Sequence, residues 1–304
     1  MKKITFFSFK GGSGRTSLLY NTLPFLANEL KASPEEPIVV IDLDIDSKGL
    51  SLLFEGASFP NTIQLLQENY RSYYIPLNGK SIQEHKLFRN MLPIGQEVGL
   101  PFDKDRSILF VSVNPTGTEE EKEKNKNLVN GSYDLGISKL GAFIEYCEKI
   151  KKCKAIIMDS PAGLQMAGQK ALKYSSDIVT VMRITKQFKL GTKEFFEEIS
   201  KTISNRNFIL IPNAVPDPEG TNYSYKSIFT NIKNMAQNSL KNNNLNLHLL
   251  EDDNYGVNEV KIFKFQETNL HKKQNLNFET LQPDELQAME MYKKVAKEIL
   301  YGEQ

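Results

Sequence analysis

Residues 4–17 read Ile-Thr-Phe-Phe-Ser-Phe-Lys-Gly-Gly-Ser-Gly-Arg-Thr-Ser, and this stretch is the most informative part of the sequence. Its apolar first half predicts a strand. The helix that follows is predicted by apolar residues at helical spacing: Leu18, Leu19, Leu23 and Leu26. The glycines between the two elements let the backbone turn tightly and point successive N–H groups inward. Because the helix presents its positive N-terminus to the same place, the stretch is typical of a phosphate-binding loop.

The loop supplies a set of candidate nucleotide-binding residues: Gly11, Gly12, Ser13, Gly14, Arg15, Thr16 and Ser17. Thr16 stands where such a loop gives a hydroxyl to Mg²⁺. Two positions depart from the general pattern, since Phe9 replaces its first Gly and Arg15 replaces its Lys. A glycine-rich turn that only joins a strand to a helix is the alternative. A dinucleotide-binding loop is disfavoured, because Ser17 stands where G-x-G-x-x-G requires its last Gly.

Continuous apolar runs recur along the chain and alternate with stretches of helical spacing. The runs are residues 37–41, 108–113, 155–158, 178–182 and 208–212, and the helical stretches include 140–150, 193–203 and 286–300. Such runs are typical of strands buried on both faces of a parallel sheet. We therefore expect one α/β domain over residues 1–304, with a doubly wound, mostly parallel sheet, helices on both faces and polar insertions.

Acidic residues follow two of these runs. Asp42 and Asp44 come after the second strand, and Asp159 ends the run 155–158. Strand side chains two apart share a face, so Asp42 and Asp44 are expected to face the same phosphate and metal region. Strand-end carboxylates of this kind hold Mg²⁺ in phosphate-binding folds, which makes Thr16, Asp42 and Asp159 the candidate metal residues. The alternative role for each Asp is a helix cap or a turn former.

Two segments resemble a known family. Lys10, two glycines and then Gly-basic-Thr are similar to the deviant phosphate loop of the ParA/MinD family of dimerising ATPases. The run Asp159-Ser160-Pro161-Ala162-Gly163 is very similar to the corresponding turn of the MinD branch. The resemblance covers about residues 1–60, 105–215 and the last helix, and it implies a P-loop NTPase fold.

The resemblance also implies cofactors, partners and roles. It implies ATP and Mg²⁺ as cofactors and a homodimer closed across ATP. Lys10 would reach the partner's nucleotide and Asp44 would orient the attacking water, so both are expected to be catalytic. Asn213 stands where the family often places an amide that binds the adenine edge, although an Asn after a strand also forms turns. The family continues the second strand with Pro-Gln, where this chain has Ile45 and Asp46.

Two functions stay open. The first is an active ATPase that switches between monomer and dimer and positions DNA or another large cargo, with an adaptor or activating protein. The second is a hydrolysis-deficient nucleotide-binding module that serves as a signalling or assembly platform. Lys10, Asp44 and Asp159 favour the first function. Arg15, with Ile45 and Asp46, favours the second function, because a planar guanidinium cannot take the place of an ammonium between the β- and γ-phosphate oxygens. The alternative is that the neighbouring backbone has adapted to Arg15.

Two polar ranges interrupt the pattern, residues 70–106 and 217–275. The first is turn-rich and is expected to carry short helices as an insertion. The second is rich in Asn and Lys, and it is either a solvated surface or a basic face for DNA phosphates. Its lysines are Lys226, Lys233, Lys241, Lys261, Lys264, Lys272 and Lys273.

The composition favours a cytoplasmic protein. The chain has 304 residues and a net charge of +1, which gives no overall attraction to nucleic acid or membranes. Cys147 and Cys153 are too few for a disulfide scaffold and are expected to be reduced thiols. No apolar run has the length of a spanning helix, and the first strand begins too early for a signal peptide. The chain stops at residues 301–304, so we expect no membrane anchor of the MinD kind.

Overall fold

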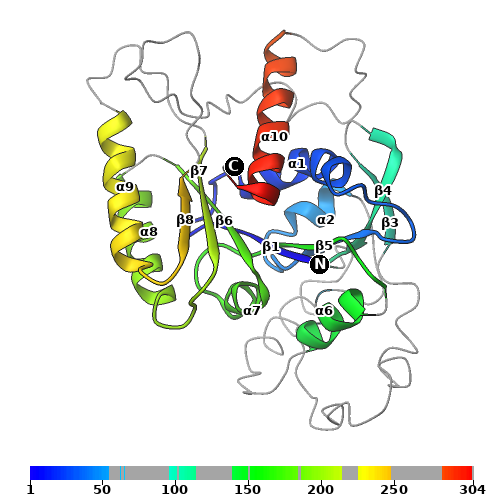
Figure 1. Ribbon diagram of the computed structural model, residues 1–304, viewed down its shortest axis with the longest axis horizontal. Coiled ribbons are helices and arrows are strands. Elements are labelled where there is room, and N and C mark those ends of the chain that lie inside the picture. The colour runs from blue at the N-terminus through cyan, green and yellow to red at the C-terminus, as the bar shows by residue number, and fades with distance from the viewer. Residues whose placement is uncertain are drawn as a thin grey trace.

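A computed structural model describes residues 1–54, 62, 65, 96–100, 103–113, 139–149, 151–183, 186–213, 225–247 and 283–302. Within these residues eight strands form one sheet in the order β3-β4-β2-β5-β1-β6-β7-β8 (Figure 1). Every neighbouring pair is parallel except β3 with β4 at one edge. The expected α/β fold with a mostly parallel sheet is confirmed.

The elements have the following bounds. The strands are β1 (Lys2–Phe7), β2 (Ile38–Asp42), β3 (Gln96–Leu100), β4 (Asp103–Val111), β5 (Ala155–Asp159), β6 (Asp177–Met182), β7 (Asn207–Pro212) and β8 (Asn244–Leu247). The helices are α1 (Arg15–Glu29), α2 (Gly49–Leu53), α6 (Lys139–Lys149), α7 (Met166–Tyr174), α8 (Lys186–Ile199), α9 (Tyr225–Ser239) and α10 (Pro283–Tyr301).

Helices cover both faces of the sheet, because successive strand residues point to opposite sides. On β2, Ile38 and Val40 pack in one cluster with α1 and α10, whereas Val39 and Ile41 pack in another with α6 and α7. A third cluster places α8 and α9 against β6 and β7. Figure 1 shows α1 and α10 on one side of the central strands, with α6 and α7 on the other. Strands buried on both faces explain the continuous apolar runs of the sequence.

The carboxyl ends of the central strands meet at one edge of the sheet. β1 lies between β5 and β6 and leads into the glycine-rich loop and α1. The registers of β2 and β5 place Asp42 directly beside Asp159. Ligands of doubly wound sheets bind outside this edge.

The structure describes only parts of the two polar ranges. At the end of the first, residues 96–100 and 103–106 belong to the antiparallel pair β3 and β4, and residues 70–95, where short helices are expected, lie outside the described residues. The range 217–275 contains α9 and then β8, which pairs in parallel with β7 and extends the sheet. These described parts continue the α/β pattern. Lys261, Lys264, Lys272 and Lys273 lie outside the described residues.

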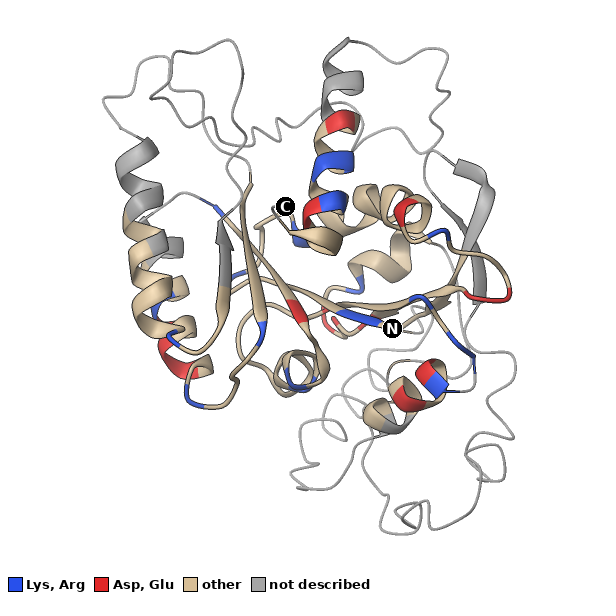
Figure 2. Ribbon diagram, viewed as in Figure 1, with Lys and Arg blue, Asp and Glu red and all other residues tan. Residues whose placement is uncertain are grey.

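The described surface carries both signs of charge. In Figure 2 acidic and basic segments lie close together along α6 and along α10, while the central strands are mostly uncharged. Cys147 on α6 and Cys153 before β5 are buried free thiols. In the part of the chain that the structure describes, no helix combines the length and the apolar character that crossing a membrane requires.

Candidate functional site

The glycine-rich loop has the left-handed backbone that its glycines allow. Gly12 has φ 75° and Gly14 has φ 80°, a region that other residues avoid. Gly14 is also the residue that precedes α1, and its carbonyl accepts the first helical hydrogen bond from Leu18 N at 2.9 Å. A Cβ at Gly14 would lie 2.2 Å from Asn213 Nδ2, so the neighbouring strand end requires glycine here as well.

The first residue of the loop packs against α8. Phe9 stands where the general phosphate-loop pattern has glycine, and its ring lies directly against Gly191 of α8. A Cβ at Gly191 would lie 2.0 Å from that ring. Ser8, which precedes Phe9, accepts a backbone hydrogen bond from Gly163 in the turn after β5 at 2.9 Å. The loop is thus attached on one side to α8 and on the other to the turn after Asp159.

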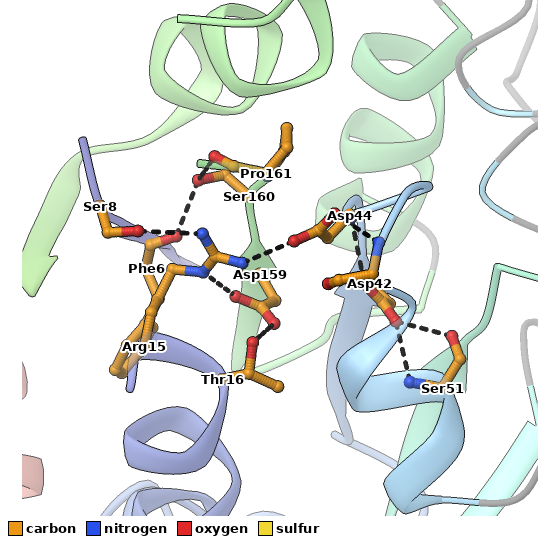
Figure 3. A network of polar contacts seen from close by, with 11 residues as sticks. Phe6, Ser8, Arg15, Thr16, Asp42, Asp44, Ser51, Asp159, Ser160 and Pro161 are labelled. Carbon is orange, nitrogen blue, oxygen red and sulfur yellow. Dashed lines mark hydrogen bonds and ion pairs between the residues drawn. The ribbon is translucent and has the colours of Figure 1, made fainter. Parts of the chain in front are cut away.

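Arg15 is the buried cation of the site. Its guanidinium donates from Nε to Asp159 Oδ1 at 2.6 Å, from Nη2 to Asp44 Oδ2 at 2.9 Å and from Nη1 to Ser8 Oγ at 3.1 Å (Figure 3). The side chain is 6% exposed. Burial alone would lower the pKa of this guanidinium, but the charges of Asp159 and Asp44 more than offset burial, so its pKa is raised. Arg15 therefore stays charged and joins the ends of β1, β2 and β5.

Asp159 binds the helix start through both oxygens. Oδ1 accepts from Arg15, and Oδ2 accepts from the Thr16 hydroxyl at 2.7 Å. The side chain is fully buried. Burial raises the pKa of the Asp159 carboxyl and the charge of Asp44 raises it further, although Arg15 and Thr16 lower it. Two carboxylates, Asp44 and Asp159, thus share one guanidinium.

Thr16 and Asp159 fit a magnesium ion. Both offer oxygen, which Mg²⁺ prefers, and their facing oxygens are 2.7 Å apart. Among the described residues no group of three or more His, Cys, Asp and Glu could hold a metal ion by itself. Beside nucleotides, Mg²⁺ is usually bound by one or two carboxylates, with water and phosphate in the other positions.

Asp42 faces away from this pair. Its Oδ2 accepts from the backbone N of Ser51 at 2.8 Å and from the Ser51 hydroxyl at 2.7 Å, while Oδ1 accepts from Asp44 N at 3.1 Å. Burial, and then the charge of Asp159, raises the pKa of the Asp42 carboxyl to about 7. β2 ends at Asp42, so the two-residue repeat of a strand no longer relates Asp42 to Asp44. Asp42 supports α2, and Asp44 faces Arg15 (Figure 3).

Asp44 occupies the turn between β2 and α2. Besides its ion pair with Arg15, Oδ1 accepts from Ser47 N at 3.1 Å, and its carbonyl accepts from Lys48 N at 2.9 Å. Both carboxylate oxygens of Asp44 therefore have a hydrogen-bond donor. The residue is buried, although its neighbour Asp46 is exposed.

Asn213 holds the loop from the end of β7. Its backbone N donates to Met182 O at 2.7 Å, and its side-chain Nδ2 donates to Ser13 O at 2.7 Å. The other side-chain atom, Oδ1, is buried and has no hydrogen-bond donor within the described residues. Buried acceptors are nearly always paired, so Oδ1 is available to a donor on a ligand.

The remaining predicted residues lie in the outer part of the loop and at the first turn of α1. Lys10, Gly11 and Gly12 are exposed, and Ser17 is half-buried on the first turn of α1. Among the residues that the structure describes, Lys10 has no ion-pair partner. Two residues of the site were not predicted, Ser8 and Ser51. Ser8 directly precedes the loop at the end of a strand, a position that could have indicated a contact with Arg15, whereas Ser51 has no comparable local signal.

The fold was compared with solved structures. No protein-family model matches the sequence, and neither does the sequence of any curated protein. Among solved structures, a putative plasmid partition protein from Borrelia burgdorferi B31, bound to AMPPNP, is 16% identical with a TM-score of 0.54, covering 97% of each chain. The ParA of pNOB8 is 15% identical with a TM-score of 0.56, over 98% of this chain and 97% of that one.

A further structure is pNOB8 ParA bound to nonspecific DNA. It is 14% identical with a TM-score of 0.52, over 98% of this chain and 95% of that one. At such low identity the likeness concerns the fold, and it spans nearly the whole chain. The chain has the fold of these ParA and plasmid partition proteins.

Proposed function

We propose that the chain is an ATPase of the ParA/MinD type, acting as an ATP-dependent dimerisation switch that positions DNA or another large cargo. The observation that carries the proposal is the joining of the loop to two strand-end carboxylates. The hydroxyl of Thr16 and the side chain of Arg15, at the first positions of α1, both contact Asp159, and Arg15 also contacts Asp44. Anions bind at such helix starts because free N–H groups and the helix dipole favour negative charge.

Each residue has a proposed role. The loop residues 11–17 bind the phosphates, and Thr16 and Asp159, with Asp42 behind them, hold Mg²⁺. When bound, Mg²⁺ neutralises charge that develops on the phosphate oxygens. Asp44 orients the attacking water. Lys10 is exposed at the mouth of the loop, where it is free to reach the nucleotide of a second copy of the chain.

The proposed base is adenine. A buried acceptor on Asn213 would pair with the exocyclic amino group of adenine, whereas guanine presents an oxygen at that position. The nucleotide analogue in the Borrelia burgdorferi structure and the nonspecific DNA in the pNOB8 structure support nucleotide and DNA as ligands of this fold. A stimulating adaptor protein and a cytoplasmic location complete the proposal.

A second candidate is a nucleotide-binding module with little hydrolysis. It is favoured by the ion pair of Arg15 with Asp44, since a carboxylate that binds a guanidinium is not available to water. Both candidates predict nucleotide binding, and they differ in turnover.

The test measures ATP turnover and oligomeric state together, in the native chain, Asp44→Ala and Arg15→Lys. We expect slow turnover, below the median enzyme rate of about 10 per second. Asp44→Ala should abolish turnover and retain an ATP-bound dimer. Glu35→Ala, which removes an exposed carboxylate before β2, is the matched control and should behave as the native chain. ATP binding without turnover that depends on Asp44 would favour the second candidate, and no ATP binding would reject both.

A further inference from the structure

Arg15 lies among the groups that would hold the metal. Its three donors bind Asp159, Asp44 and Ser8, so the guanidinium bridges the ends of three strands that are far apart in the sequence. The exposed fraction of its side chain is 6%, and that of Asp159 is 0%. The other cation of the loop, Lys10, is exposed. One positive charge is thus placed inside the site, against the carboxylates.

We propose that Arg15 is an exchangeable internal counter-ion, which closes the magnesium position until nucleotide phosphates draw it away. While it contacts Asp44 and Asp159, Arg15 offsets part of their charge and repels a divalent cation beside it. This inference rests on the proposed nucleotide and magnesium site. It adds an order of binding: the phosphates first draw Arg15 away from the carboxylates, and the carboxylates then bind the metal.

The first argument is the occupancy of the carboxylates. Asp159 accepts from Arg15 on one oxygen and from Thr16 on the other. Asp44 accepts from Arg15 on one oxygen and from the backbone of Ser47 on the other. All four oxygens already have donors, and the strongest of these donors is a cation. A metal ion at Thr16 and Asp159 would lie next to that cation and be repelled by it.

The second argument is the position of Arg15 in the chain. It is the first residue of α1 and follows Gly14, whose left-handed backbone turns the loop toward the helix start. Phosphates bound at this helix start would lie close to the residue that carries the guanidinium. Arg15 can therefore exchange carboxylate oxygens for phosphate oxygens by rotating its side chain, and planar guanidinium binds both groups well.

The third argument is the balance of charge. Two buried acids, Asp44 and Asp159, contact the single guanidinium of Arg15, so one positive charge faces two carboxyl groups. When Arg15 turns to phosphate, two carboxylates are left without their cation. Uncompensated buried carboxylates attract a divalent cation, so metal and nucleotide binding become coupled through this one side chain.

The test measures Mn²⁺ binding without nucleotide, by electron paramagnetic resonance of the free ion, in the native chain and Arg15→Gln. The substitution removes the charge and keeps a polar side chain. We expect no saturable binding by the native chain, and an affinity at least about tenfold tighter in Arg15→Gln, since the carboxylates lose a competing cation. Lys10→Gln removes a cation from the same loop and should bind Mn²⁺ as weakly as the native chain.

A second measurement follows the coupling itself. The dissociation constant of AMPPNP is measured in EDTA and in Mg²⁺ for the native chain and Arg15→Gln. Mg²⁺ should lower the dissociation constant of AMPPNP in both proteins. We expect the factor to be at least about fivefold larger for the native chain, because the variant has no counter-ion to displace. An equal effect of Mg²⁺ in both proteins would make Arg15 a permanent structural cation and would overturn the proposal.

The variants must fold for the result to count. Circular dichroism checks Arg15→Gln, and Arg15→Lys is the second variant, because its single ammonium keeps the charge but cannot bridge both carboxylates. Arg15→Lys should bind Mn²⁺ more tightly than the native chain, and equal affinity in the native chain and the folded variants would overturn the proposal. The inference and the proposed function fail separately. A gain of Mn²⁺ binding without any AMPPNP binding rejects the function, whereas AMPPNP binding without a gain rejects the counter-ion.

Discussion

Two aspartates end neighbouring parallel strands at the same level of the sheet, and their surroundings differ. Asp42 of β2 and Asp159 of β5 are paired in register and both are fully buried. Asp42 accepts hydrogen bonds from neutral donors, Ser51 and the backbone of Asp44. Asp159 accepts from a cation, Arg15, and from the Thr16 hydroxyl at the start of α1.

Under the proposed function, this difference makes Asp159 the acid that binds Mg²⁺ directly and Asp42 the acid that supports it from behind. Donors from the local backbone and from α2 fix Asp42 in one place, and protonation leaves that arrangement largely intact. Asp159 depends on side chains that a nucleotide and its metal would also bind. Burial and position in the sheet are the same for both residues, so the donors around a carboxylate, rather than its exposure, indicate its role.

Removing the charge from each acid should change the free energy of unfolding by different amounts, and we expect the largest effect at Asp159. Asp159→Asn separates Arg15 from one of two carboxylates, and we expect a loss of about 3 kcal/mol in the free energy of unfolding, typical of a broken buried ion pair. Asp42→Asn keeps an acceptor for Ser51, and we expect a loss of about 1 kcal/mol. Urea denaturation at pH 7 measures both. Equal losses of unfolding free energy would mean that the two acids contribute equally to stability.

The pH dependence of stability should reveal the raised pKa of Asp42. The pKa of Asp42 rises from an ordinary 3.8 to about 7 on folding, because of burial and then the charge of Asp159. The folded chain therefore holds a proton that the unfolded chain has lost, and stability falls as the pH rises between these values. The slope due to this group is at most about 1.4 kcal/mol per pH unit.

Denaturation between pH 4 and pH 8 tests this dependence. Asp42→Asn should flatten the slope, and a part should remain, since burial also raises the pKa of Asp159. A slope unchanged in Asp42→Asn would assign the whole effect to other groups.

A third strand end extends the comparison to the nucleotide. Asn213 after β7 combines a donor bound to Ser13 with a buried acceptor that has no donor in the described part of the chain. We expect Asn213→Ala to weaken ATP binding about tenfold, near 1.4 kcal/mol, and GTP binding less. Fluorescent nucleotide titration measures both. Asn207→Ala, at the other end of β7, is the control, and an equal loss for the two nucleotides would count against a contact with the base.

The smallest expected effect on stability concerns Lys10. Lys10→Gln replaces an exposed side chain, and we expect the free energy of unfolding to change by less than about 0.5 kcal/mol. If Lys10 acts on the partner's nucleotide, turnover should fall while folding is unchanged. Thermal unfolding and ATP turnover, measured on the same sample, separate the two. A variant with native turnover would remove Lys10 from the proposed mechanism.

The sequence predicts the parts of the site that depend on local pattern. The loop, the strand before it and the helix after it follow from glycine positions and apolar spacing, and the acids at the strand ends follow from the ends of apolar runs. The sheet and its mostly parallel direction follow from the same runs. These features depend on residues that are close together in the sequence, so the spacing of residue types predicts them.

The direction of each acid could not be predicted, because it depends on distant partners. Asp42 binds Ser51 across a turn in which Lys48 has φ 52°, an uncommon conformation for lysine. Arg15 reaches Asp159, which lies 144 residues along the chain. Strand β3 and its antiparallel pairing with β4 were missed for a similar reason, since a short strand in a polar range leaves little periodic signal.

The packing of Phe9 on Gly191 restricts which residues evolution can place at these two positions. The loop and α8 are joined by a ring that fills the space of an absent side chain, so neither position can change freely without the other. Among distant relatives the two sites should therefore vary together, with larger residues at 191 accompanying smaller ones at 9. Such paired change would recognise members of this lineage even where overall identity is as low as that found here.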